Sequence, residues 1–151
     1  MTDYTELNGR LESLIAGVPH TIANLANASA LLWESLADIN WAGFYLREEE
    51  TLVLGPFQGK VACIEIPWGK GVCGTAAALD ATQLVYDVHD FPSHIACDSA
   101  SNSEIVVPLH RGNEVAAVLD IDSPRVGRFS EADREGLEDF ARVLEKNLFE
   151  D

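Results

Sequence analysis

The sequence predicts an α+β fold in which helices pack on one face of a central antiparallel sheet. Amphipathic helical patterns occupy the two ends of the chain, and short strand-like segments fill its middle. Several of these segments are paired across tight turns, which is typical of antiparallel hairpins. The 151 residues contain no repeat or linker, so we predict a single domain spanning 1–151. A sheet with helices on one face leaves the other face for a ligand pocket under loops.

The predicted helices lie near the two termini. Apolar residues recur at helical spacing over residues 7–15 and again over 22–39, with a break at Gly17 to Pro19. Near the C-terminus, Ser130 and Asp133 form an N-cap pattern ahead of a third apolar stripe. Each stripe requires an apolar surface to pack against.

The predicted strands supply that surface. They are residues 41–47, 52–57, 62–66, 83–86, 104–110 and 114–122, with a short helical stretch at 75–79. A glutamate-rich turn joins the first two strands, and Arg111-Gly-Asn113 joins the last two. Both pairs are therefore expected to be antiparallel hairpins.

Alternation along these strands assigns side chains to faces. In the last strand, one face carries the aliphatic residues Val115, Ala117, Leu119 and Ile121. The helices are expected to pack against this face. The opposite face collects two aromatic side chains and three carboxylates. These are Trp41, Tyr45, Glu104, Asp120 and Asp122. Such a set on a shared face predicts a ligand pocket.

The carboxylates have two interpretations. Asp120 and Asp122 stand where a strand ends, so they can be solvated or cap the turn at Ser123-Pro124. With Glu104 on the same face, a functional cluster becomes an equal alternative. Such a cluster can hold an ammonium group or bind a hard cation. It can also keep one proton, because neighbouring carboxyl groups cannot all ionise together. A carboxylic acid that keeps its proton can serve as a general acid.

Composition narrows the class of partner. A net charge of −15 with only 10 lysine and arginine residues argues against binding nucleic acid or an anionic membrane surface. No apolar run approaches the ~18 residues that a membrane span requires, and the N-terminus lacks a signal pattern. We therefore expect a cytoplasmic protein whose partner is a small molecule or another protein.

Three cysteines indicate thiol chemistry. Structural disulfides are rare in the cytosol, so an odd set of cysteines points to catalysis, metal binding or packing. Cys63 is expected in a short strand, and Cys73 in a glycine turn before a helix, where the helix N-terminus favours thiolate. Cys97 falls in a long aperiodic segment, residues 87–103, that we interpret as a lid. A zinc site formed by the three cysteines and His94 is disfavoured, because no Cys-x-x-Cys pair is present.

The chain resembles the free methionine-(R)-sulfoxide reductases, which are GAF-domain enzymes, over essentially its whole length. The motifs that carry the resemblance are Asn40-Trp-Ala-Gly-Phe-Tyr45, Leu54-Gly-Pro-Phe-Gln-Gly59, Gly69-Lys-Gly-Val-Cys-Gly74 and Val118-Leu-Asp-Ile-Asp-Ser-Pro124. The cysteine spacing, ten and then twenty-four residues, is similar to that family's three-cysteine signature.

The resemblance implies thiol-dependent reduction of free L-methionine (R)-sulfoxide to methionine. Cys97 would attack the sulfoxide sulfur and become a sulfenic acid, and Cys63 would condense with it to a disulfide. Cys73 can take part in resolution, and its use as the attacking thiol stays open. Thioredoxin would then reduce the disulfide, and we expect no bound cofactor or metal.

The resemblance also implies roles for the predicted pocket. Glu104, Asp120 and Asp122 would protonate the sulfoxide oxygen and hold the substrate ammonium group, while Trp41 and Tyr45 enclose the methylthio end. GAF domains often pair through their terminal helices, so a homodimer is expected. The alternative is a non-catalytic GAF module that binds a small molecule and signals.

Overall fold

The computed structural model describes residues 1–92 and 100–148. Four α-helices, one 3-10 helix and six strands follow one another in these residues. Their order is α1 (Tyr4–Ile15), α2 (Thr21–Ser35), β1 (Trp41–Glu48), β2 (Thr51–Gly59), β3 (Glu65–Pro67), α3 (Gly71–Leu79), β4 (Gln83–Val85), η1 (Val88–Asp90), β5 (Ser103–Arg111), β6 (Glu114–Ser123) and α4 (Glu131–Leu148). The strands form one sheet of order β3-β2-β1-β6-β5-β4, and every pair of neighbours is antiparallel.

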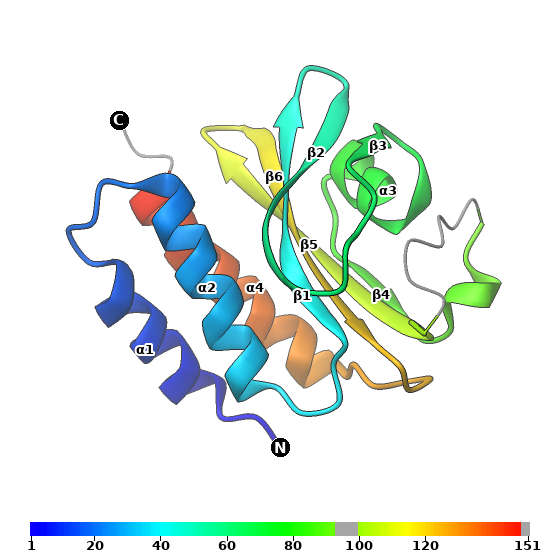
Figure 1. The fold of residues 1–151 in the computed structure, drawn as a ribbon, viewed down its shortest axis with the longest axis horizontal. Coiled ribbons are helices and arrows are strands. Elements are labelled where there is room, and N and C mark those ends of the chain that lie inside the picture. Colours follow the sequence, from blue (N-terminus) through cyan, green and yellow to red (C-terminus); the bar gives the residue numbers. More distant parts are fainter. Residues whose placement is uncertain (93–99, 149–151) are drawn as a thin grey trace.

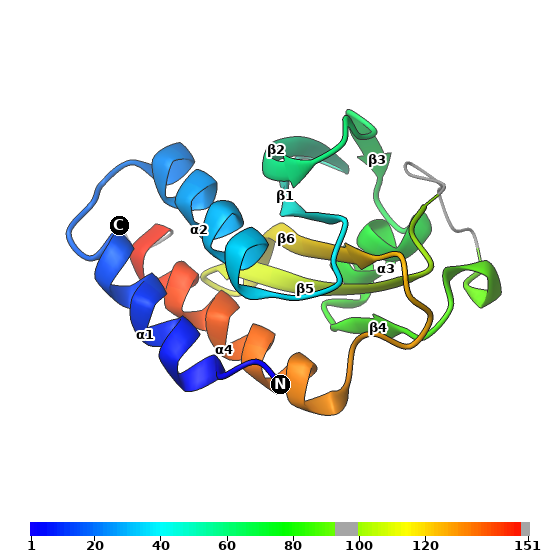
Figure 2. The ribbon, with the colours of Figure 1, turned by 60° about the horizontal axis from the view of Figure 1, so that its bottom comes forward.

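Helices α2 and α4 cover one face of this sheet, and α1 packs against both of them. Figures 1 and 2 show α1, α2 and α4 gathered on the same side, with α3 on the other. Leucines of all three helices pack with the aliphatic side chains of β1, β5 and β6 into a dry core that includes Phe44 and Phe140. The predicted aliphatic face and the helices that take it are therefore confirmed.

The second face carries a smaller core beneath α3. Val72, Ala76 and Ala77 of α3 pack on the sheet beside Trp41 and Tyr45. The C-terminal end of α3 is tied to α4 through His110, whose two ring nitrogens lie within hydrogen-bonding distance of carboxylates of Asp80 and Glu145. Since α3 is anchored at this end, its first turn is held over the sheet.

Several local predictions are confirmed, and two are wrong. Both hairpins form, and Ser130 and Asp133 cap α4 reciprocally, with each backbone N–H donating to the other's side chain at 3.2 and 2.9 Å. The strand predicted over 62–66 is instead β3, which begins at Glu65, so Cys63 lies in the segment before it. The short helix expected at 75–79 begins at Gly71, which places Cys73 inside its first turn.

None of the helices in the described part of the chain is both long enough and apolar enough to cross a membrane.

Candidate active site

Strand register brings the predicted acidic residues together. On β6, Asp122 is paired with Trp41 of β1 on one side and with Glu104 of β5 on the other. Two residues earlier, Asp120 is paired with Gly43 of β1. Residues directly opposite one another point to the same face. Glu104, Asp120 and Asp122 therefore form one acid cluster on the face that α3 covers, as the alternation predicted.

The first turn of α3 closes over this acid cluster. Gly74 permits a close approach, because a Cβ there would lie 2.5 Å from the carbonyl oxygen of Pro67. The amide of Gly69 also donates to the carbonyl of Gly74 at 2.9 Å, which fixes the glycine turn against the helix. Cys73 is thereby directed inward: it is 4% exposed, and its thiol shares a hydrogen bond with Asp120.

The expectation that Cys73 is activated as a thiolate is wrong. Burial raises the pKa of the Cys73 thiol well above its usual range, and the neighbouring acidic residues, Asp120 first among them, raise it further. These effects outweigh the helix N-terminus, whose influence falls off within the first turn. Cys73 is a free, neutral thiol in this structure.

The pKa of the Glu104 carboxyl is raised within the cluster. Glu104 is 7% exposed, and burial raises the pKa of its carboxyl well above the ordinary glutamate value. Asp120 and Asp122 raise this pKa further, both through their charges and through hydrogen bonds to Glu104. A neutral carboxylic acid is both a hydrogen-bond donor and a proton donor, so Glu104 has the properties of a general acid.

The same groups have the donor set of a metal site. The Sγ of Cys73 and carboxylate oxygens of Glu104 and Asp120 all lie within 4.8 Å of one another. A thiolate with two carboxylates suits a borderline cation such as Zn²⁺. Metal binding would require Cys73 and Glu104 to lose their protons, which their raised pKa values oppose.

Aromatic rings form the wall next to the cluster. Trp41 stacks on Tyr45, with ring centroids 5.8 Å apart, and on Phe57 at 5.0 Å. Both predicted aromatics lie on the acid-cluster face, as expected. Phe57 was not among the residues predicted for the pocket, although its pairing with Gly43 in the first hairpin places it beside Trp41. The stack provides an apolar surface next to carboxyl groups.

Tyr45 links this wall to Cys63. Its hydroxyl donates a hydrogen bond to the carbonyl oxygen of Cys63 at 3.0 Å. Burial and the charge of Asp120 raise the pKa of Tyr45, so the phenol stays protonated and keeps donating. Cys63 is disulfide-bonded in this structure. Residues 93–99 of the predicted lid lie outside the described residues, and they include His94 and Cys97.

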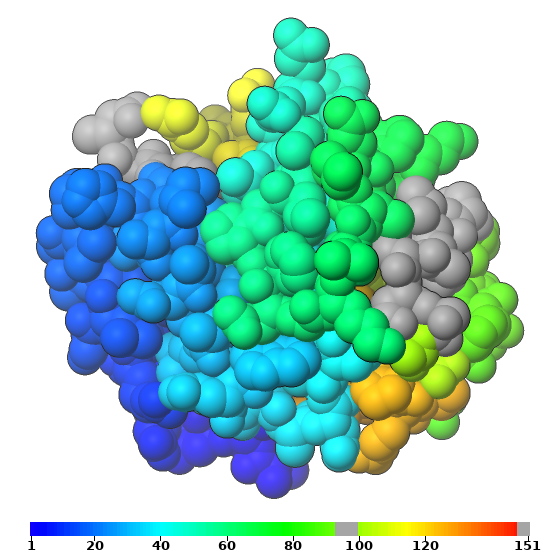
Figure 3. Space-filling view, viewed as in Figure 1, coloured from blue at the N-terminus to red at the C-terminus, as the bar shows by residue number. Residues whose placement is uncertain are grey.

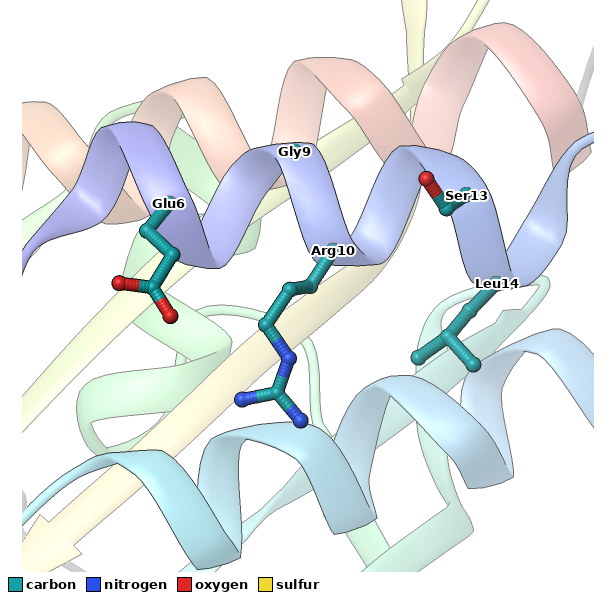
Figure 4. Close-up of a pocket in the computed structure, with 5 residues that line it drawn as sticks. All are labelled: Glu6, Gly9, Arg10, Ser13 and Leu14. Carbon is teal, nitrogen blue, oxygen red and sulfur yellow. The ribbon is translucent and has the colours of Figure 1, made fainter.

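A surface groove lies away from the acid cluster, on the side of the molecule formed by α1, α2 and α4. This shallow groove on α1 is lined by Glu6, Gly9, Arg10, Ser13 and Leu14 (Figure 4). Arg10 extends toward α2, where it forms an ion pair with Glu34 at 2.7 Å. The groove brings together neither the cysteines nor the acid cluster.

The fold and the placement of the site on the sheet face opposite the main helices define a GAF domain, and the GAF domain family model matches residues 11–148. A free methionine-R-sulfoxide reductase of Escherichia coli is 58% identical over 145 residues, which cover 96% of this chain and 88% of that protein. The chain belongs to the free methionine-R-sulfoxide reductase family of GAF-domain proteins.

Solved structures support this assignment. The reduced form of fRMsr from Staphylococcus aureus is 53% identical, with a TM-score of 0.95, and the match covers 98% of this chain and 96% of that one. The free methionine-R-sulfoxide reductase of Neisseria meningitidis, solved in complex with its substrate, is 46% identical with a TM-score of 0.93. That match covers 95% of this chain and 87% of the other.

Proposed function

We propose that this chain reduces free L-methionine (R)-sulfoxide to methionine at the acid cluster, with Cys97 as the attacking thiol. The chain is then an oxidoreductase that acts on a sulfur group and uses its own cysteines as the first electron donor. The observation that carries the proposal is the cluster of Glu104, Asp120 and Asp122 beside the aromatic wall, where burial and neighbouring carboxyl groups raise the pKa of Glu104. A sulfoxide oxygen requires a proton donor, and an amino acid's ammonium group requires carboxylates.

The first half of the cycle transfers two electrons from sulfur to sulfur. The Cys97 thiolate attacks the sulfoxide sulfur while an acid of the cluster protonates the oxygen, and Glu104, whose pKa is raised, is the acid that we assign to this step. Methionine leaves as the reduced product, and Cys97 keeps the oxygen as a sulfenic acid. The sulfoxide sulfur has then gained the two electrons that the cysteine sulfur has lost.

The second half of the cycle restores the thiols. The Cys63 thiol attacks the sulfenic sulfur of Cys97, water leaves, and a disulfide remains. The state of the described cysteines supports Cys63 as the resolving residue, because Cys63 is disulfide-bonded while Cys73 is a free thiol. A dithiol protein such as thioredoxin then reduces the disulfide. Such a cycle suits a reducing compartment, so the cytoplasm remains our prediction for its location.

The site is expected to select free methionine sulfoxide over sulfoxide within a polypeptide. A free amino acid presents an ammonium group, which Asp120 and Asp122 can hold as a charge-assisted contact in a buried site. Acetylation of the substrate nitrogen removes that charge and adds bulk at the same position. It would leave the carboxylates without their cation.

Comparison of free and N-acetylated methionine (R)-sulfoxide tests this proposal. With dithiothreitol as the reductant, we expect kcat/KM for the acetylated compound to be lower by about 100-fold or more. Charged hydrogen bonds contribute roughly 1.5–3 kcal/mol, and repulsion between the carboxylates left without their cation adds to that loss. N-methyl methionine (R)-sulfoxide, which adds bulk but keeps the positive charge, is the control. Equal turnover of the free and acetylated compounds would contradict the proposed site.

We also propose that the protein is a homodimer that pairs through its terminal helices. The side of the molecule formed by α1, α2 and α4 carries three exposed apolar side chains, Leu14 on α1 and Ile22 and Trp33 on α2. Association would remove them from water. Light scattering provides the test, and a mass of 16.4 kDa, that of one chain, would contradict it.

A further inference from the structure

The segment between β2 and β3 presents an exposed apolar pair beside Cys63. Val61 is 88% exposed and Ile64 is 71% exposed, and apart from Met1 these are the most exposed large apolar side chains in the described ranges. Cys63 lies between them, partly buried. The segment crosses the front of the molecule in Figure 1 and lies at the surface in Figure 3.

Hydrogen bonds from the aromatic wall and from β2 hold this segment in place. The indole N–H of Trp41 donates to the carbonyl of Lys60 at 3.1 Å, and the amide of Leu54 donates to the carbonyl of Ile64 at 2.9 Å. Between these points, Tyr45 donates to the carbonyl of Cys63. Ala62 and Cys63 pack against the second core, so the backbone turns Val61 and Ile64 outward. Their exposure is therefore a property of the fold and not of a loose loop.

We propose that Val61 and Ile64 form the docking surface for the dithiol protein that reduces the Cys63 disulfide. The proposal rests on the proposed function, because a catalytic cycle is what requires this disulfide to be reduced at every turnover. The occupant follows from the disulfide itself. A protein reductant must bring a thiolate into contact with a sulfur, and the apolar pair lies on both sides of Cys63. Apolar side chains held at a fixed surface position are typical of a protein contact.

Reduction of the Cys63 disulfide takes place in two exchange steps. One thiolate of the partner's Cys-x-x-Cys pair attacks Sγ of Cys63, a new S–S bond forms between the two proteins, and the cysteine formerly bonded to Cys63 leaves as a thiolate. The partner's second thiolate then attacks the partner's own sulfur in this mixed disulfide, and Cys63 leaves in its reduced form. The partner loses two electrons and becomes a disulfide, while this chain gains two and regains both thiols.

Substitution of the apolar pair tests the docking surface directly. Val61→Asp and Ile64→Asp are measured beside Leu79→Asp, a control at the end of α3, where an apolar side chain is 66% exposed. Each variant is assayed with thioredoxin, thioredoxin reductase and NADPH, and separately with dithiothreitol, which requires no docking surface. We expect the KM for thioredoxin to rise about tenfold or more in the first two variants and to stay unchanged in the control. Turnover with dithiothreitol should be unchanged in all three.

The outcomes separate the two proposals. An unchanged KM for thioredoxin in both Val61→Asp and Ile64→Asp would overturn the docking surface and leave the proposed function intact. Absence of turnover with dithiothreitol in the unaltered protein would overturn the proposed function and the docking surface together.

The attacked sulfur is tested by trapping. Thioredoxin with its second active-site cysteine replaced by serine cannot complete the exchange, so the mixed disulfide accumulates. We expect peptide mapping to find it on Cys63 and its yield to fall in Ile64→Asp. Attachment to Cys97 would overturn the proposal.

Discussion

Replacement of Cys97 by serine is expected to abolish turnover, with a loss on the order of 10³-fold or more in kcat, because a neutral hydroxyl replaces the proposed nucleophile. The acid cluster and the aromatic wall lie on β1, β2, β5 and β6, so methionine should still bind. Methionine release with separated substrate epimers measures the loss, and quenching of tryptophan fluorescence reports binding.

Single-turnover experiments distinguish attack from resolution. Cys63→Ser keeps the proposed attacking thiol and loses the proposed resolving one, so it should release one methionine per chain and then stop under thioredoxin. Cys73→Ser should keep a burst of the same size, since the buried Cys73 is a neutral thiol. A burst that survives in Cys97→Ser but disappears in Cys73→Ser would reverse the two assignments.

Replacement of Glu104 by glutamine is expected to lower kcat by about 10²–10⁴-fold, the usual contribution of a general acid. Glutamine keeps the shape and a hydrogen-bond donor but cannot give up a proton to the sulfoxide oxygen. In the unaltered protein the protonated acid is the active form, so kcat should fall as the pH rises through the raised pKa of Glu104. The variant should lack that pH dependence. Glu12→Gln, on the exposed face of α1, is the matched control, with unchanged kcat.

Glu104→Gln should raise the stability of the fold at alkaline pH, although it lowers kcat. The pKa of Glu104 is raised on folding, so its contribution to stability is fully present below the ordinary glutamate pKa and is lost as the pH rises through the folded-state value. Glutamine cannot ionise, and Glu104→Gln should therefore unfold at a higher temperature than the unaltered protein at alkaline pH. A lower melting temperature together with unchanged kcat would show that Glu104 is structural and not catalytic.

Much of the acid cluster could be predicted from the sequence because its residues lie on regular strands. Once two hairpins are assigned, the period of two along a strand places Glu104, Asp120 and Asp122 on one face, and the structure has them there. The raised pKa of a carboxyl in that cluster also follows from like charges placed close together, and the structure assigns it to Glu104.

The cysteines were harder to place because tertiary contacts decide their surroundings. Cys63 was expected in a strand, but the hydrogen bonds of Trp41 and Tyr45 hold the preceding segment beside the aromatic wall. Cys73 follows glycines that indicate a turn, and only the packing of α3 on the sheet shows that its thiol lies against Asp120. Helix starts within glycine-rich turns are poorly marked in sequence, since glycine adopts both helical and left-handed backbone conformations.

The most direct test of the central claim is thioredoxin-coupled oxidation of NADPH by the fully reduced protein, measured with the separated R and S epimers of free methionine sulfoxide. We expect turnover with the R epimer and none with the S epimer. In the proposed site, the chiral sulfur is expected to present its oxygen to the acid cluster in only one of the two epimers. Turnover of both epimers, or of neither, would contradict the account, and binding of methionine without turnover would favour a non-catalytic GAF module.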